Sequence, residues 1–298
     1  MNHNHSKKTR RNVIKTLALG SLTLSALGAF SPISAKKEAV ALKGNINHSV
    51  CRWTFGGLSL EELCTVVKKI GFAAIDLAGP KDWPTLKSQG IYSSMCNGAE
   101  MNLVDGWNDK KFHDTLVKNY TEHIQLVAKA GYKNLICFSG NRRGMDDETG
   151  LQNCTEGLKK VLAIAEKNNV TLVMELLNSK KDHKDYMCDR TSWGAELCRR
   201  LDSENFKLLY DIYHMQVDEG DVIQTITDHH QYIAHYHTAG VPGRHEIDET
   251  QELYYPAIMR AIVKTGFKGY VAQEFIPTGK TDAEKSEALK NAINICDI

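Results

Sequence analysis

Four short apolar runs, each ending in a residue that can bind a metal ion, place the strongest limits on how this chain can fold. The runs occupy residues 171–174, 206–210, 233–236 and 269–273, and the residues that end them are Glu175, Asp211, His237 and Glu274. From one of these residues to the next the chain advances about 36, 26 and 37 positions, close to the roughly 30 residues or more of a strand–helix–strand unit. Since a barrel of parallel strands brings the C-terminal ends of all its strands to one mouth, we expect the four side chains to converge.

The types of these residues indicate a divalent cation. Two glutamates, one aspartate and one histidine form an oxygen-rich set with a single imidazole, which suits Mg²⁺ or Mn²⁺, with Co²⁺ or Zn²⁺ as alternatives. A single acidic residue after a strand is more often a solvated loop residue or a helix N-cap. Four suitable residues at the same place in four consecutive units favour the metal site over that simpler interpretation.

Strand-like and helix-like segments alternate along the whole chain after its N-terminal part. Before the four runs, the pattern predicts strands at residues 49–53, 73–77, 91–96 and 134–138. The predicted helices occupy residues 59–70, 82–89, 109–130, 154–168, 192–201, 220–228, 253–264 and 283–293. Eight strand–helix units without a dividing linker predict an α/β fold, a (β/α)8 TIM barrel, that forms one domain over residues 36–298.

The first 35 residues have the plan of a signal peptide. A basic start precedes an uncharged apolar stretch at residues 16–30, and Ser34-Ala35 then comes before charged residues. The run at residues 9–15 contains Arg10-Arg11 and resembles a twin-arginine (Tat) signal. The sequence therefore predicts an exported, periplasmic protein with no stable membrane insertion after cleavage at Ala35; an uncleaved amphipathic anchor is the alternative.

The net charge bears on which partners the protein binds, and the cysteine content bears on whether it contains disulfides. The formal net charge of the 298 residues is +1, which does not indicate nucleic acid as a partner. Eight cysteines are present without a CxxC pair, and in a domain of this size we expect them to be buried free thiols. A small molecule is thus the expected partner, and the sequence leaves the oligomeric state open.

Residues next to the four predicted ligands are candidates for binding a substrate. His214 lies three positions after Asp211 and can bind a substrate oxygen, move a proton or orient a ligand. Arg244 follows a Pro-Gly turn and can hold a carboxylate or phosphate in two-point fashion, or else pair with Glu246 on the surface. Asn178, near Glu175, and Glu246 complete the predicted substrate-binding set.

Two glutamates at a metal site are suited to proton transfer next to a carbonyl group. A cation polarises the carbonyl of a hydroxy-carbonyl compound and stabilises the enediolate that forms when a neighbouring proton leaves. Glu175 or Glu274 would remove the proton, and the same or the opposite glutamate would return one. Return to the adjacent carbon gives an isomerase, and return to the other face gives an epimerase.

Longer motifs around these residues resemble a known family. The motifs are Met174-Glu175-Leu176-Leu177-Asn178, Asp211-Ile212-Tyr213-His214-Met215-Gln216, Val241-Pro242-Gly243-Arg244-His245-Glu246 and Gln273-Glu274-Phe275-Ile276-Pro277. In this order they resemble the xylose isomerase-like TIM barrel superfamily, and within it the hydroxypyruvate isomerase family.

The resemblance implies metal ligands at Glu175, Asp211, His237 and Glu274, proton transfer by the two glutamates, and substrate contacts from His214 and Arg244. The implied reaction is the aldose–ketose type isomerisation of hydroxypyruvate to tartronate semialdehyde. A ketose or keto-sugar 3-epimerase on the same site and a non-catalytic, metal-dependent carbohydrate-binding protein are the alternatives.

Overall fold

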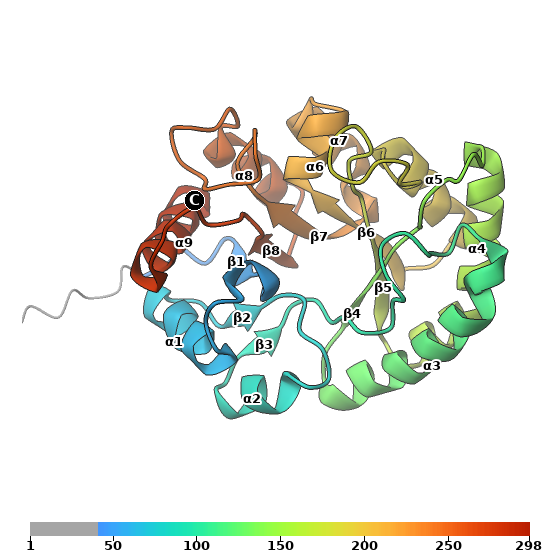
Figure 1. Cartoon of the computed structure of the whole chain (residues 1–298), viewed down its shortest axis with the longest axis horizontal. Helices are drawn as coiled ribbons and strands as arrows, with labels where there is room; N and C mark the ends of the chain where they lie inside the picture. Colours follow the sequence, from blue (N-terminus) through green and yellow to red (C-terminus); the bar gives the residue numbers. More distant parts are fainter. Residues whose placement is uncertain (1–40) are drawn as a thin grey trace, which may run out of the picture. The chain divides into compact units, whose positions relative to one another are not determined.

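The computed structural model describes residues 41–298, which form a ring of parallel strands surrounded by helices (Figure 1). The strands are β1 (Asn47–Val50), β2 (Ala74–Ile75), β3 (Tyr92–Ser93), β4 (Asn134–Cys137), β5 (Thr171–Glu175), β6 (Phe206–Asp211), β7 (Ile233–Thr238) and β8 (Tyr270–Gln273). The helices are α1 (Leu60–Ile70), α2 (Trp83–Ser88), α3 (His113–Ala130), α4 (Asp147–Lys167), α5 (Thr191–Leu201), α6 (Ile212–Asp218), α7 (Val222–His229), α8 (Tyr255–Lys264) and α9 (Asp282–Cys296). Three short 3₁₀ helices are η1 (Trp53–Phe55), η2 (Lys110–Phe112) and η3 (His230–Tyr232).

Backbone hydrogen bonds close the strands into a barrel. Six strands form one parallel sheet in the order β1-β8-β7-β6-β5-β4, and β2 pairs with β3. Single bridges join the two sheets, Cys51 to Asp76 at one seam and Cys96 to Leu135 at the other. The predicted (β/α)8 barrel is therefore confirmed, and the carboxyl ends of its strands share one mouth.

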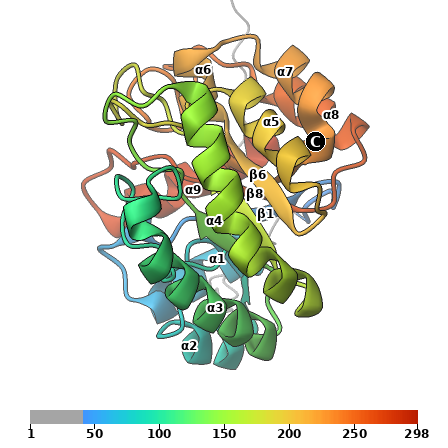
Figure 2. The ribbon, with the colours of Figure 1, turned by 90° about the vertical axis from the view of Figure 1, so that its right-hand side faces the viewer.

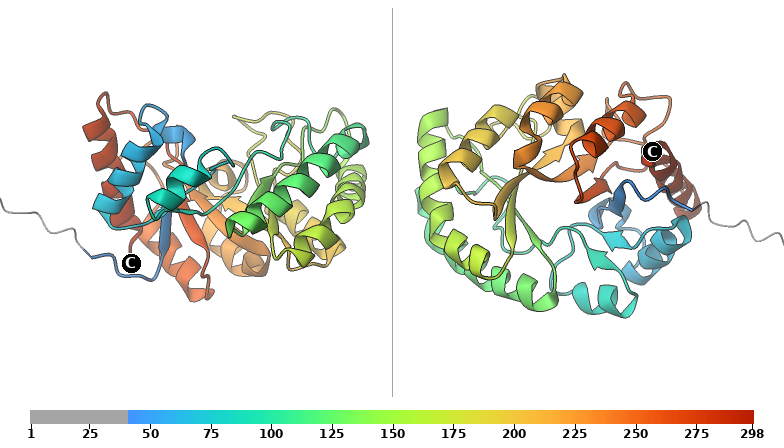
Figure 3. Two further views of the ribbon diagram at one scale, coloured as in Figure 1. Left: turned by 90° about the horizontal axis from the view of Figure 1, so that it is seen from below. Right: turned by 180° about the vertical axis from the view of Figure 1, so that it is seen from behind.

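The sequence signals of the helices correspond to the observed ends. Ser59 caps α1 in a capping box with Glu62, and Gly71 ends the helix in a left-handed conformation. Neighbouring helices α3, α4 and α5 lie side by side along one flank (Figure 2), and the other helices continue around the strands (Figure 3). The helices thus cover the outer face of the strands and shield it from water, as a parallel sheet requires.

The structure differs from the predicted elements in three places. Helix α4 begins at Asp147, seven residues before the predicted start, because Asp146 caps it by accepting a hydrogen bond from the Thr149 amide. The ladders of β2 and β3 contain only two residues each, since their further contacts are the single bridges at the seams. Helix α6 was not predicted, and it follows Asp211 without an intervening loop.

Two sequence predictions about the rest of the chain have different outcomes. All eight cysteines are free and buried, which confirms the prediction of unpaired thiols. Among residues 41–298, no helix has the length and apolar character needed to cross a membrane. The predicted signal peptide at residues 1–35 lies outside the described residues and stays a prediction.

Two loops at the barrel mouth approach each other closely at Gly106. A methyl group on Gly106 would lie 2.3 Å from the Gly140 nitrogen and 2.5 Å from the Ser139 carbonyl oxygen. The neighbouring bonds, Trp107 N–H to Phe138 O and Asn108 N–H to Ser139 O, hold the loops in this contact. Because the obstacles are backbone atoms, no side-chain rotation can relieve the overlap.

Substitution Gly106→Ala is therefore expected to lower the free energy of unfolding by about 1–3 kcal/mol, the usual cost of overpacking. Urea unfolding followed by circular dichroism measures this change. Gly57→Ala is the matched control, since the nearest atom to its new methyl group is the flexible Lys285 Nζ at 3.7 Å. Equal stability of the two variants would contradict the close contact.

Candidate metal centre

Four buried ligand atoms converge where strands β5 to β8 end. Glu175 and Asp211 are the last residues of β5 and β6, His237 is the next-to-last residue of β7, and Glu274 follows β8. The register places Asp211 directly beside His237. One ligand atom from each of the four residues lies within 4.8 Å of the others, so the structure brings the four predicted ligands together.

Within residues 41–298, two of these buried ligand atoms have no hydrogen-bond partner. They are Glu175 Oε1 and His237 Nδ1. The imidazole nitrogen lies 3.3 Å from Glu175 Oε1 and 2.8 Å from Glu274 Oε2, yet these pairs are not aligned as hydrogen bonds. Burying polar atoms without partners is costly, and a cation among these atoms would satisfy them. The residues present therefore fit a divalent metal ion.

Asp211 is both a helix cap and a candidate ligand. Its Oδ1 accepts the backbone N–H of His214 at 3.1 Å and so caps α6. Its Oδ2 lies 3.4 Å from the Arg244 guanidinium, on the side of the cluster. Asp211 can therefore be a helix N-cap and a metal ligand at the same time, since each role uses a different carboxylate oxygen.

Arg244 is held over the cluster by its backbone and by two aromatic rings. Its Nη2 lies 2.5 Å from Glu274 Oε2, and its guanidinium lies 5.3 Å and 5.6 Å from the ring centres of Trp53 and Tyr213. The backbone of Arg244 has a φ of 61°, a left-handed conformation that is uncommon outside glycine. Its carbonyl accepts the Ile276 amide at 2.7 Å, so the guanidinium is fixed where a substrate would enter.

The buried acids differ in how readily they ionise. Burial and the charge of Glu274 raise the pKa of Glu175. Burial opposes ionisation of Glu274 too, but the positive charges of Arg244 and His237 outweigh it and hold its pKa well below the usual range. Burial raises the pKa of Asp211 to about 8, against the charge of Arg244. Paired carboxyl groups whose pKa values are driven apart are typical of acid–base sites.

His214 is positioned as a neutral hydrogen-bond donor. Burial and the charge of Arg244 hold its pKa well below the usual value. Asn178 Nδ2 donates to His214 Nδ1 at 2.6 Å, so the ring carries its proton on Nε2. That nitrogen is buried and has no partner. Asn178 therefore lies behind His214, and His214 Nε2 lies 3.6 Å from Asp211 Oδ2, beyond hydrogen-bond distance. A substrate contact from His214 stays a prediction.

Glu246 lies apart from the four ligands. Its carboxylate accepts the backbone N–H of Thr278 at 2.6 Å and the Thr278 hydroxyl at 3.1 Å, and so links the loop after β7 to the loop after β8. The pairing with Arg244 considered from the sequence does not form, because Arg244 turns toward Glu274. A direct substrate contact from Glu246 stays a prediction.

A cavity of about 330 Å³ opens beside the cluster. Its lining includes Glu175, Glu274 and Arg244, together with residues that the sequence did not single out as ligands or bases: Trp53, Asn97, Glu100, Met101, Asn102 and His183. Four of these lie in the long loop at residues 97–108, whose length was the available signal. Trp53 donates its indole N–H to Glu274 Oε1 at 2.8 Å, whereas Trp107 is fully buried in the core.

Comparisons with known proteins identify the family. Residues 64–293 match the family described as "Xylose isomerase-like TIM barrel", so the chain belongs to it. A 2-oxo-tetronate isomerase of Cupriavidus necator is 33% identical over 43% of this chain and 48% of its own length. The matched part thus spans about half of that relative. A Drosophila melanogaster protein provisionally named hydroxypyruvate isomerase is 28% identical over 75% of this chain and 88% of its own length.

Solved structures show the same fold at low identity. The structure of 3-keto-D-glucoside 4-epimerase from E. coli superposes with a TM-score of 0.69 and 17% identity, covering 84% of this chain and all of the other. Likeness at this level of identity shows the shared barrel alone.

Metal binding is expected to release protons below about pH 8. A cation favours the ionised form of Asp211, whose pKa burial raises to about 8, so affinity for Mn²⁺ should increase as the pH rises from 6 to 8. Calorimetric titration of the metal-free protein in two buffers of different ionisation enthalpy measures the released protons. Asp211→Asn should bind Mn²⁺ weakly and with a smaller pH dependence, since Glu175 still has a raised pKa. An affinity of wild-type protein that does not change with pH would contradict the prediction.

Proposed function

We propose that this member of the xylose isomerase-like TIM barrel family is a divalent-metal-dependent isomerase of a small hydroxy-carbonyl acid, with hydroxypyruvate as the first substrate to test. The observation that carries the proposal is the convergence of two buried glutamates, Asp211 and His237 at one barrel mouth, with unpartnered ligand atoms facing one another. Relatives named as isomerases of 2-oxo-tetronate and hydroxypyruvate support the same reaction class.

The two glutamates divide the proton transfer between them. When bound, Mg²⁺ or Mn²⁺ would be held by Glu175, Asp211, His237 and Glu274 and would polarise the substrate carbonyl. Glu274, kept ionised by Arg244, is available as the base for the proton on C3 of hydroxypyruvate. Glu175 would return a proton to C2. The hydroxyl proton on O3 moves to O2, so the isomerisation neither gains nor loses atoms.

Two further side chains position the substrate. The Nε2–H of His214 is an unused donor for a hydroxyl or carbonyl oxygen. Arg244 provides a fixed cation at the cavity, and a guanidinium is suited to a carboxylate. Since Arg244 already contacts Glu274, a substrate carboxylate would share this cation with the proposed base.

Epimerisation of a ketose or keto-sugar is the second candidate, and the size of the cavity favours considering it. Hydroxypyruvate has few heavy atoms, whereas a cavity of about 330 Å³ has room for roughly ten water molecules at about 30 Å³ each. Its lining adds Asn97, Asn102 and Glu100, which can bind hydroxyl groups. The same two glutamates on opposite faces of a sugar carbon would invert that carbon. A carbohydrate-binding protein without turnover remains the third candidate, and two opposed bases disfavour it.

Substitutions Glu175→Gln and Glu274→Gln are each expected to reduce turnover by about 10²–10⁴-fold, the usual contribution of a general acid or base. Proton NMR in D₂O, with Mg²⁺ and either hydroxypyruvate or a ketose, measures solvent exchange and product formation. Glu156→Gln is the control, since Glu156 is an exposed residue that pairs with Lys110 on the surface. Wild-type rates in either glutamate variant would refute the assigned roles, and absence of exchange on every compound that binds would favour a binding protein.

Arg244→Lys separates the two candidate substrate classes. If the substrate carries a carboxylate, loss of the two-point contact should raise KM for that acid by about tenfold or more, corresponding to about 1.5–3 kcal/mol for a charged hydrogen bond. For a neutral ketose the KM should change much less. Steady-state kinetics on both compounds measures the difference, and an equal change in both KM values would exclude a carboxylate-binding role.

A further inference from the structure

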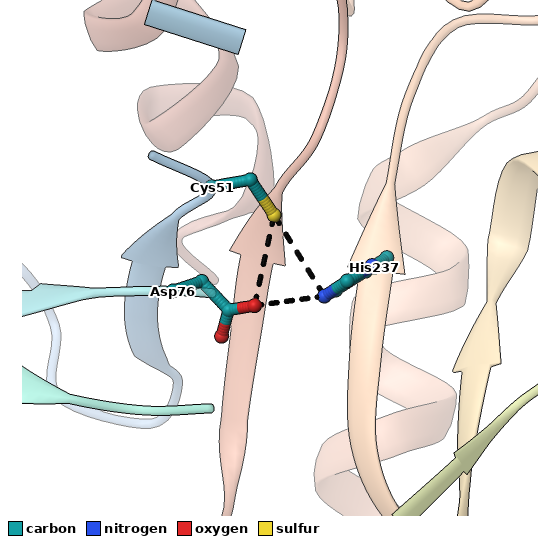
Figure 4. Close-up of side chains that lie close together, drawn as sticks. All are labelled: Cys51, Asp76 and His237. Atoms are coloured by element: carbon teal, nitrogen blue, oxygen red, sulfur yellow. Dashed lines mark hydrogen bonds and ion pairs between the residues drawn. The ribbon is translucent and has the colours of Figure 1, made fainter. Parts of the chain in front are cut away.

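A buried carboxylate lies behind His237, on the side of the imidazole away from the metal centre. Asp76 follows β2 and has no exposed surface. Its Oδ1 lies 3.0 Å from His237 Nε2 and forms a hydrogen bond with it (Figure 4). The other ring nitrogen, Nδ1, is the atom that faces Glu175 and Glu274. The ring of His237 is therefore held between Asp76 and the candidate ligands.

This geometry selects one tautomer of the imidazole. A carboxylate can only accept a hydrogen bond, so Nε2 must carry a ring proton, and in the neutral ring Nδ1 then presents its lone pair. We propose that Asp76 is a positioning residue that holds His237 in the Nε2–H tautomer and so makes Nδ1 a metal ligand. The proposal rests on the metal centre described above and adds a residue directly after β2 that the sequence analysis did not identify as part of the site.

A hydrogen-bond network fixes the orientation of the Asp76 carboxylate. Ser94 Oγ donates to Asp76 Oδ2 at 2.6 Å, and Ser49 Oγ lies 2.6 Å from Ser94 Oγ. His235, on the same face of β7 as His237, brings its Nε2 to 2.8 Å from Asp76 Oδ2, although without hydrogen-bond alignment. With Oδ2 held by Ser94, Oδ1 remains directed at His237.

The same side chains could alternatively be considered a second metal site. Cys51 Sγ lies 3.7 Å from both Asp76 Oδ1 and His237 Nε2, and the three residues form a group that could hold an ion. Hydrogen bonds already satisfy these atoms, however. The unpartnered ligand atoms, His237 Nδ1 and Glu175 Oε1, lie in the other cluster. The hydrogen-bond pattern thus favours one metal at Nδ1 and a proton at Nε2.

The first test is the tautomer itself in folded, metal-free protein, at a pH high enough for the His237 ring to be neutral. Long-range ¹⁵N–¹H correlation spectra of histidine-labelled protein distinguish the two tautomers, and comparison with His237→Gln assigns the signal. We expect the Nε2–H form in wild-type protein. Finding the Nδ1–H form overturns the proposal whether or not any metal binds.

The second test compares metal affinity between variants. Asp76→Asn is expected to weaken Mn²⁺ binding in calorimetric titrations by about 10–100-fold, the usual effect of losing such a partner, and to increase the population of the Nδ1–H tautomer. Ser94→Ala, which removes a hydrogen bond from the same carboxylate but keeps its charge, should change the affinity much less. Asp76→Asn protein with wild-type affinity and tautomer overturns the proposal.

Cys51→Ser distinguishes the second-metal alternative. Purified wild-type protein that holds zinc, measured by mass spectrometry, and loses it in Cys51→Ser would place an ion at Nε2 and overturn the proposal. Unchanged metal content and Mn²⁺ affinity in this variant support it. If wild-type protein binds neither Mg²⁺ nor Mn²⁺ at all, the proposed function fails, whereas the tautomer measurement still decides the role of Asp76.

Discussion

The structure depends on a balance of charge at the barrel mouth, where buried acidic side chains need positive charge or protons beside them. Glu175, Asp211 and Glu274 are all buried within a few ångströms of each other, and isolated carboxylates in such a place would be strongly disfavoured. Arg244 compensates Glu274 most closely. The remaining negative charge can be balanced by protons, which the raised pKa values of Glu175 and Asp211 indicate, or by a divalent cation. Protons and a bound cation would therefore compete for these side chains.

The hydrogen-bonded strands of the barrel fix the candidate ligands, and the loops supply the other side chains that surround them. Three ligands lie at the ends of strands in one continuous sheet, so hydrogen-bonded ladders set their separation. Arg244 and the cavity residues at positions 97–103 belong to loops instead. This division allows one barrel to serve different substrates, because strand ends carry the candidate ligands and loop residues line the cavity beside them.

Asp76 extends this organisation into the interior of the barrel. His237 has one nitrogen toward the proposed metal and one toward Asp76. Asp76 directly follows β2, far from His237 in the sequence. Ser94, which directly follows β3, donates a hydrogen bond to the Asp76 carboxylate. The short strands β2 and β3, which carry none of the four ligands, thus contribute to the geometry of the site through hydrogen bonds across the interior.

The sequence by itself determined the alternation of strands and helices and the four candidate ligands. It could do so because apolar periodicity reports local structure and because parallel strands bring equivalent positions to one mouth. Only the tertiary structure decided that Asn178 supports His214, that Glu246 binds Thr278 rather than Arg244, and that Asp76, Trp53 and Glu100 lie at or behind the site. These contacts join residues from different strand–helix units, and no local pattern encodes which side chains meet across a closed barrel.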